Sequence, residues 1–355
     1  MRHFWRKRTI SLVPGRWLSF PAGLWGLFLA LAPLVAPGAA HGAEQPKLAL
    51  PIRCEPGRDC WLVNRVDLDP GPGVRDYACH GRTYDGHKGT DIAIRDLEVM
   101  NKGVAVLASA AGIVRGGRDG MADVDFTKKG GPKIESRECG NGVVLAHGDG
   151  WETQYCHMRR GSVMVRLGDK VEKGQQLGLV GHSGRAQFPH VHLSVRLKQK
   201  IIDPFAGLGR TENCRPGPKP LWEPETLARL GQDTTAVFHV GFASGAPKPD
   251  AARAGRLNGK TMPAIAPALV LWADIYWVNE GDELIISITA PNGTVLTRRA
   301  QSIKKTQARY FGFAGKKRKL QRWPEGVYRG EIVLRRVSGT AKKMEIKVTR
   351  DIEIR

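Results

Sequence analysis

Residues 81–208 carry short runs in which apolar and polar side chains alternate, separated by glycine and aspartate. The alternation is clearest over residues 192–197, and residues 91–94 have the same strand-like character. Turns are expected at residues 148–150 and 167–169, where glycine and aspartate are neighbours. Because a strand points successive side chains to opposite faces, a period of two predicts an antiparallel β-sheet for this domain.

Residues 232–355 predict a second, separate β-domain. Its candidate strands are short and closely spaced, at residues 234–243, 268–277, 283–289, 294–299, 308–313, 326–335 and 344–354. The sequence Pro-Asn-Gly-Thr at residues 291–294 is typical of a hairpin turn. About seven short strands in about 120 residues predict an immunoglobulin-like β-sandwich. Such a domain is expected to bind or position and not to catalyse.

The remaining segments are expected to support or connect these two domains. Residues 44–80 contain cysteines and are expected to pack on the first domain. Residues 209–231 form a proline-rich linker with a short helical stretch at Glu225–Leu230. The glycine-rich insert 116–140 has no clear periodicity, and it is a candidate wall of a groove.

Residues 1–43 have the features of a secretory signal peptide. Five cations and no acidic residue precede Glu44, and an apolar run covers residues 24–32. Small residues then lead to a cleavage point expected between Ala40 and Glu44. An uncleaved membrane anchor is the alternative, but this run is shorter than the roughly 20 residues that a spanning helix needs. We therefore expect export to the periplasm or the cell envelope.

Export would place the six cysteines of the chain in an oxidising compartment, where disulfides form. Six cysteines allow about 15 full connectivities, so spacing alone leaves the pairing open. The candidate pairs are Cys54 with Cys60, Cys139 with Cys156, and then Cys79 with Cys214. A nucleophilic Cys156 beside His157 is a weaker alternative, because a strand points neighbouring side chains to opposite faces.

Two short motifs carry the candidate chemistry. His87 lies four residues before Asp91, and His190 and His192 form a His-x-His about a hundred residues later. Alternate positions of a strand share a face, so both histidines of the second motif point into one site. Imidazole and carboxylate ligands suit zinc, and three protein ligands leave a fourth position open for water. The chain has no HExxH motif, which excludes the helical zinc-binding arrangement.

A third motif, Tyr155–Met158, lies between these two. The three motifs in this order resemble the lysostaphin-type (LytM-domain) zinc metallopeptidases. The resemblance covers roughly residues 76–206. Further matching segments are Gly103–Val114, Asn141–Gly148, Leu167–Gln175, Gly181–Gly184, Phe188–His192 and Ile202–Pro204.

The resemblance implies that His87, Asp91 and His192 bind Zn²⁺. It also implies that His157 and His190 flank the attacking water and the scissile carbonyl, and which of them is the general base stays open. Family members cut peptide bonds in peptidoglycan. We therefore expect an exported zinc metallo-endopeptidase that hydrolyses peptidoglycan cross-links or stem peptides.

Two alternative functions remain. One is a non-catalytic protein of the LytM fold that activates or positions another cell-wall hydrolase. The complete set of five residues disfavours it. The other is a peptidase that acts on ordinary proteins.

The charge of the chain adds a candidate partner. The net charge is +21, and without the five cations of the leader it is +16. Residues 232–355 carry 22 cations and 11 anions. A basic exported protein favours anionic polymers or membrane surfaces of the envelope, whereas no nucleic-acid-binding motif is present. The candidate docking surface is the basic run Lys316–Lys319 with Tyr310, Phe311, Phe313 and Trp323. The alternative is a solvated face without a ligand.

Overall fold

The computed structural model describes residue 15 and residues 45–127, 134–209, 214–231, 234–336 and 343–355. One compact unit begins at Ala43 and extends to the C-terminus. The predicted signal peptide, residues 1–43, lies outside the described residues apart from Gly15. None of the helices in the described ranges is long and apolar enough to cross a membrane.

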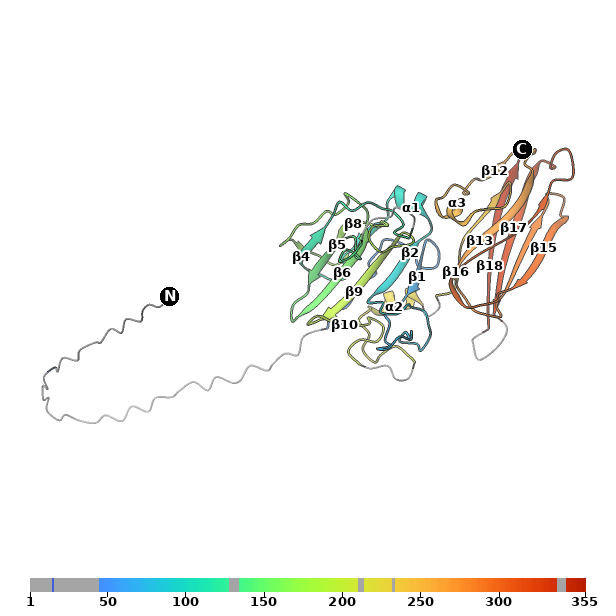
Figure 1. Ribbon diagram of the computed structural model, residues 1–355. Coiled ribbons are helices and arrows are strands. Elements are labelled where there is room, and N and C mark those ends of the chain that lie inside the picture. The colour runs from blue at the N-terminus through green and yellow to red at the C-terminus, as the bar shows by residue number, and fades with distance from the viewer. Residues whose placement is uncertain (1–14, 16–44, 128–133, 210–213, 232–233, 337–342) are drawn as a thin grey trace, which may run out of the picture. The chain divides into compact units, whose positions relative to one another are not determined.

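The first domain is built on an eight-stranded antiparallel sheet, drawn from blue to yellow-green in Figure 1. Seven strands follow the order β1-β2-β9-β6-β5-β4-β7, and β10 also pairs with β9. The bounds are β1 Cys60–Asn64, β2 Thr90–Ile94, β4 Gly112–Arg118, β5 Asn141–Ala146, β6 Trp151–Met158, β7 Lys170–Val171, β9 His190–Leu197 and β10 Lys200–Ile201. The smaller elements are β3 (Ala105–Leu107), which pairs with β8 (Gln176–Leu179), and the helices α1 (Leu97–Lys102) and α2 (Pro224–Leu230).

The centre of this sheet buries polar residues together with apolar ones. All five residues of β2 are buried, including Thr90 and Asp91. Burial of a carboxylate is costly unless it has partners, so this strand already marks a functional region. The segment before β2 belongs to the same core, because Leu48 and Ile52 are buried in it and β1 pairs with β2.

The second domain is a β-sandwich of two sheets, and it is drawn in orange to red in Figure 1. One sheet has the order β11-β13-β16 and the other β12-β18-β17-β14-β15. The bounds are β11 Ala236–Ala243, β12 Thr261–Met262, β13 Ala268–Val278, β14 Glu283–Thr289, β15 Val295–Ser302, β16 Gln307–Lys317, β17 Gly326–Arg336 and β18 Met344–Ile354. The inner faces of both sheets contribute to one apolar core.

The observed strands confirm the mostly β, antiparallel class predicted from the alternation. The seven strands predicted for the second domain correspond to β11 and β13–β18, whereas the two-residue β12 and the helix α3 (Pro249–Arg253) were missed. Both are too short to produce a periodic pattern. The immunoglobulin-like topology stays a prediction.

The aromatic residues of the predicted docking surface differ in exposure. Trp323 is buried, and its Nε1 donates a hydrogen bond to the carbonyl of Ala266 at 2.8 Å. Phe311 stacks on the buried Trp272 with ring centres 5.6 Å apart. Phe313 is 43% exposed. Stacking of a sugar ring beside the basic run would therefore use Phe313 and not Trp323.

A small aromatic cluster joins the two domains. Trp61 and Val63 of β1 pack there against Phe238 of β11 and Tyr276 and Trp277 of β13. The indole Nε1 of Trp277 donates a hydrogen bond to the carbonyl of Val63 at 2.6 Å. The second domain is thus anchored on a strand that borders β2.

All six cysteines form disulfides, as Cys54–Cys60, Cys79–Cys214 and Cys139–Cys156. The predicted short loop between Cys54 and Cys60 is confirmed. The same holds for the pairing of Cys139 with Cys156, which removes Cys156 as a candidate nucleophile. The bond between Cys79 and Cys214 links the segment before β2 to the segment after β10.

Candidate metal centre

Three neighbouring strands and one turn bring the five predicted site residues together. Asp91 of β2 lies opposite His192 of β9 in the antiparallel register, and His192 lies opposite Cys156 of β6. His87 occupies the turn before β2, where its ring lies 4.9 Å from that of His192. The rings of His157 and His190 have centres 4.5 Å apart.

Three ligand atoms form a compact triangle. His87 Nε2 and His192 Nδ1 are 3.1 Å apart, and Asp91 Oδ1 lies 3.2 Å and 2.8 Å from them. A tetrahedral Zn²⁺ with bonds of about 2.0–2.1 Å separates its ligand atoms by about 3.3–3.4 Å. The triangle is slightly smaller than that, so expansion by a few tenths of an ångström admits the ion. The residues present therefore fit Zn²⁺.

A partner on its far side orients each ligand. His87 Nδ1 bonds to the carbonyl of Arg65 at 2.6 Å, which leaves its Nε2 free of the proton. Asn64 donates from Nδ2 to Asp91 Oδ2 at 2.8 Å, so Oδ1 stays available. These contacts fix the tautomer of the imidazole and the rotation of the carboxylate, which lowers the cost of assembling a metal site.

The third ligand has a similar partner. His192 Nε2 lies 3.0 Å from the hydroxyl of Ser194, two residues along the same strand. With Nε2 engaged, Nδ1 faces the other two ligands. The sequence motifs indicated neither Ser194 nor the partners of the other two ligands. The only available signal was a polar residue at the end of an apolar strand, as with Asn64 in Cys-Trp-Leu-Val-Asn.

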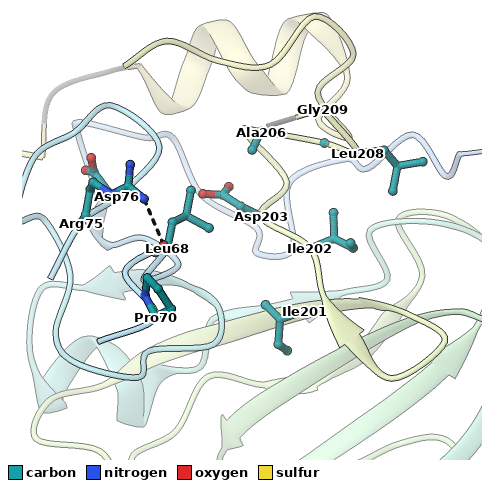
Figure 2. A pocket seen from close by; sticks show the side chains of 11 residues that line it. Leu68, Pro70, Arg75, Asp76, Ile201, Ile202, Asp203, Ala206, Leu208 and Gly209 are labelled. Atoms are coloured by element: carbon teal, nitrogen blue, oxygen red, sulfur yellow. Dashed lines mark hydrogen bonds between the residues drawn. The ribbon is translucent and has the colours of Figure 1, made fainter. Parts of the chain in front are cut away.

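A buried charge network supports the turn that carries His87. The Arg65 side chain is fully buried and pairs with Asp76 at 2.8 Å. Its guanidinium lies 4.8 Å from the ring centre of Tyr77. Figure 2 shows Asp203 beside this network, with its carboxylate turned toward Leu68 and Asp76. The network holds the backbone at Arg65, whose carbonyl orients His87.

A bulge in β6 turns His157 into the site. The pairing of β6 with β5 is irregular between Asn141 and Val143, and His157 has a φ of 61°. A positive φ is uncommon outside glycine and persists where the surroundings enforce it. Here the amide of His157 donates to the carbonyl of Cys139 at 2.8 Å, beside the Cys139–Cys156 disulfide.

His157 and His190 each have one free imidazole nitrogen toward the ligand triangle. His157 Nδ1 bonds to the carbonyl of Ser183 at 2.8 Å, and His190 Nδ1 bonds to the carbonyl of Phe188 at 2.8 Å. His190 Nε2 lies 3.6 Å from Asp91 Oδ1. Among the described residues neither Nε2 makes a hydrogen bond, so both imidazoles can exchange protons with a bound molecule.

The electrostatics divide the site into a carboxylate and mostly neutral imidazoles. Burial alone would raise the pKa of Asp91, but the neighbouring His87 and His190 and the hydrogen bonds from His192 and His87 hold that pKa well below its usual range. Burial, with the nearby charges of His190 and His192, lowers the pKa of His157 far below its usual value. His157 is therefore neutral at neutral pH.

The pKa values of the two histidine ligands, His192 and His87, shift in opposite directions. Burial lowers the pKa of His192 in spite of its hydrogen bond to Asp91. For His87 burial also acts to lower the pKa, but the charge and hydrogen bond of Asp91 outweigh it and the net direction is upward.

The other histidines among the described residues lie outside the triangle. His147 bonds to the carbonyl of Ala111 at 2.7 Å and to the hydroxyl of Thr153 at 2.8 Å, and burial lowers its pKa. His182 is buried beside an adjacent pocket, and burial lowers its pKa to about 4. Among the described residues, the other group of metal-type side chains is Cys54, Asp59 and Cys60, whose cysteines are disulfide-bonded.

A pocket of about 330 Å³ opens onto the triangle. Asp91 and His190 line it, together with Tyr84 and the insert residue Phe126. The ring of Tyr84 lies 4.4 Å from that of His87. The glycine-rich insert 116–140, which was predicted as a candidate wall of a groove, thus contributes Phe126 to this wall. A larger pocket of about 510 Å³ is lined by Asp76 and Asp203 and by none of the five site residues.

The segment that contains the five site residues is similar to known proteins. The sequence model of Peptidase family M23 matches residues 85–204, a range that contains all five site residues. The peptidoglycan DD-endopeptidase ShyA of Vibrio cholerae is 36% identical over 64 residues, which are 18% of this chain and 14% of that protein. The cell division protein DipM of Caulobacter vibrioides is 38% identical over 77 residues, 20% and 12% of the two chains.

A third relative matches a longer stretch of the chain. The DD-carboxypeptidase/endopeptidase Mpg of Neisseria meningitidis is 30% identical over 108 residues, 30% of this chain and 22% of that one. The chain therefore spans less than a quarter of the length of each of these three relatives.

Solved structures of similar proteins include two catalytic domains. The M23 protein EnpA from Enterococcus faecalis is 22% identical, with coverage of 46% of this chain and 96% of that domain and a TM-score of 0.30. Lysostaphin from Staphylococcus simulans is 21% identical, with coverage of 40% and 85% and a TM-score of 0.26. The family match, which rests on the sequence, carries the assignment: this chain contains a domain of peptidase family M23 at residues 85–204.

Proposed function

We propose that the protein is an exported zinc metallo-endopeptidase that hydrolyses peptide bonds in peptidoglycan. The observation that carries the proposal is the triangle of His87, Asp91 and His192 with two further histidines at its edge. Relatives named as peptidoglycan endopeptidases and the three disulfides support the substrate and the export.

His87, Asp91 and His192 would hold the metal, whereas His157 and His190 would act on the water and the substrate. Zn²⁺ held by the triangle would lower the pKa of water from about 15.7 to about 7 and polarise a carbonyl. The Nδ1 atoms of His157 and His190 bond to backbone carbonyls, so the Nε2 of one imidazole can accept a proton from the attacking water. The other imidazole would donate from Nε2 to the oxyanion in its protonated form, with a proton on both nitrogens. Asn64 and the carbonyl of Arg65 keep Asp91 and His87 oriented throughout.

The test is digestion of purified cell-wall sacculi, with identification of the released peptides by mass spectrometry. Replacement of either His157 or His190 by Ala should lower turnover by roughly 100-fold or more while zinc remains bound. Asp91→Ala and His192→Ala should lose the ion, measured as metal equivalents per chain. Full zinc content in both of these variants would contradict the ligand assignment. Unchanged turnover in both histidine variants would contradict the proposed catalysis.

A non-catalytic binding protein is the second candidate. One of the relatives, DipM, is named for cell division and not for a peptidase activity. For this alternative, the protein should bind sacculi and stimulate a separate hydrolase, and its own digests should contain no new peptide ends. The same mass-spectrometric assay, run with and without the second hydrolase, separates the two functions.

A further inference from the structure

One wall of the pocket at the metal centre comes from the C-terminal domain. Tyr276 and Trp277 of β13 and Arg309 of β16 line the pocket of about 330 Å³ that also contains Asp91 and His190. A molecule that reaches the metal centre through this pocket therefore contacts side chains of both domains.

An irregularity in β13 directs two neighbouring aromatic side chains toward the first domain. In a regular strand Tyr276 and Trp277 would point to opposite faces. Trp277 has a φ of 51°, and the pairing of β13 with β16 skips this residue. Both side chains are consequently buried in the cluster between the domains, where Trp277 bonds to Val63. Such a backbone conformation is costly for a bulky residue and persists only where the surrounding packing enforces it.

Arg309 is held rigidly at the pocket. Its Nη2 and Nε donate to the carboxylate of Asp274 at 2.9 Å and 3.2 Å. Its Cζ lies 5.5 Å from the ring centres of Phe188 and Tyr276 and 5.2 Å from that of Phe238. The Nη1 atom makes no hydrogen bond to another described residue, and the side chain is 16% exposed. A fixed guanidinium with a free N–H loses little freedom when it binds a carboxylate.

Arg309 pairs with Asp274, and the charge of Asp125 also acts on it. Arg253 also donates to Asp274, at 2.9 Å, so two guanidinium groups share one carboxylate. Arg185, which also lines the pocket, is exposed, and its Cζ lies 6.0 Å from the ring centre of Phe126. In the part of the chain that the structure describes, Arg185 has no carboxylate within ion-pair distance. The two arginines that line the pocket, Arg309 and Arg185, can therefore hold an anionic group.

The position of Arg309 limits where that group lies on a peptide. Arg309 is 5.5 Å from Phe188, whose ring is 4.8 Å from that of His190, so the guanidinium lies within about 10 Å of His190. An extended peptide advances about 3.3–3.6 Å per residue, so this distance corresponds to roughly two or three residues.

We propose that the C-terminal domain completes the substrate cleft, and that Arg309 and Arg185 select peptides with a free carboxylate within two or three residues of the cleaved bond. This inference rests on the proposed function. It assigns the substrate class, an acidic peptide, and gives the second domain a direct part in recognition.

The probe is the cross-linked peptide dimer that a glycan-cleaving enzyme releases from sacculi. It is used in its native form and with its carboxylates converted to primary amides, which have nearly the same shape without the charge. Cleavage by the full-length zinc-loaded protein gives kcat/KM for each form. Binding of both forms is measured by calorimetry on the His157→Ala variant, which is expected to retain zinc and turn over slowly.

Wild type should prefer the native dimer by about 10- to 100-fold in kcat/KM, the usual size of one or two charge-assisted hydrogen bonds. Arg309→Gln and Arg185→Gln should each reduce this preference, mainly through KM. Arg309→Gln leaves Asp274 paired with Arg253, and Arg185→Gln removes no ion pair of the described chain, so the second variant tests the idea even if the first unfolds. Arg299→Gln, an exposed residue of β15 outside the pocket, is the control and should keep the preference.

The outcomes separate this inference from the proposed function. Cleavage of both forms at equal rates would overturn the inference and leave the peptidase function intact. A preference that survives in both arginine variants would also overturn it. Binding of the native dimer that depends on Arg309 or Arg185, without any cleavage by wild type, would support the recognition and refute the peptidase function.

Discussion

The buried carboxyl of Asp203 gives the sharpest prediction for stability. Asp203 is 3% exposed and lines the pocket of about 510 Å³ among apolar side chains such as Leu68 and Ile202. Its Oδ1 accepts a hydrogen bond from the amide of Phe205 at 2.8 Å, whereas Oδ2 has no partner among the described residues. Burial raises the pKa of Asp203 from 3.8 to about 7, in spite of the amide of Phe205 and the charge of Arg65.

Proton linkage sets the direction in which the free energy of unfolding changes with pH. Because the folded state holds the proton of Asp203 more tightly than the unfolded state, this carboxyl destabilises the fold progressively as the pH rises from about 4 to about 7. At 1.36 kcal/mol per pKa unit, the full cost is about 4 kcal/mol at high pH. Between pH 5 and pH 8 the cost increases by about 2.5 kcal/mol.

The perturbation is Asp203→Asn, whose amide does not ionise. The free energy of unfolding, measured in urea at pH 5 and at pH 8, should shift in favour of the variant by about 2.5 kcal/mol between the two pH values. Any loss of shape or hydrogen bonding in the variant is independent of pH and cancels in this difference. Asp149→Asn, in an exposed turn, controls for the loss of one carboxylate. A difference between wild type and Asp203→Asn that stays constant from pH 5 to pH 8 would refute the raised pKa.

Three further predictions concern the metal site, the disulfides and the basic run. Asn64→Ala should weaken zinc binding by about 10- to 100-fold, because Asp91 loses the donor that orients it; competition with a chelator measures this, and unchanged affinity would contradict it. Replacement of both Cys79 and Cys214 by Ser should lower the free energy of unfolding by about 4 kcal/mol, because the bond closes a loop of 135 residues; a loss under about 1 kcal/mol in denaturant titration would argue against that origin. Full-length protein should pellet with anionic vesicles at about 0.1 M salt and be released at about 1 M; salt-independent binding, or binding that survives neutralisation of Lys316–Lys319, would exclude an electrostatic contact.

Short-range patterns in the sequence were sufficient for the strands and for the ligand types. Alternation over residues 283–289 predicted β14 with its observed bounds, because the period of two is a property of the backbone itself. The two histidine motifs likewise indicated a site, since imidazole and carboxylate at close spacing have few structural uses. The structure places His87, Asp91 and His192 within reach of one ion, together with His157 and His190.

Contacts between distant segments decided the partners of the metal ligands, the orientation of His157 and the exposure of surface residues. Asn64 meets Asp91 only because β1 and β2 are adjacent, and the bulge that turns His157 into the site depends on the register of β5 and β6. Trp323, predicted near the docking surface, is buried because its indole completes the core of the sandwich. The sequence also did not predict that Arg309 of the second domain lines the pocket at the metal centre. The sequence by itself determined which segments form strands and which residues can bind a metal, whereas the tertiary structure decided which surfaces meet, because burial depends on the fit of faces far apart in the chain.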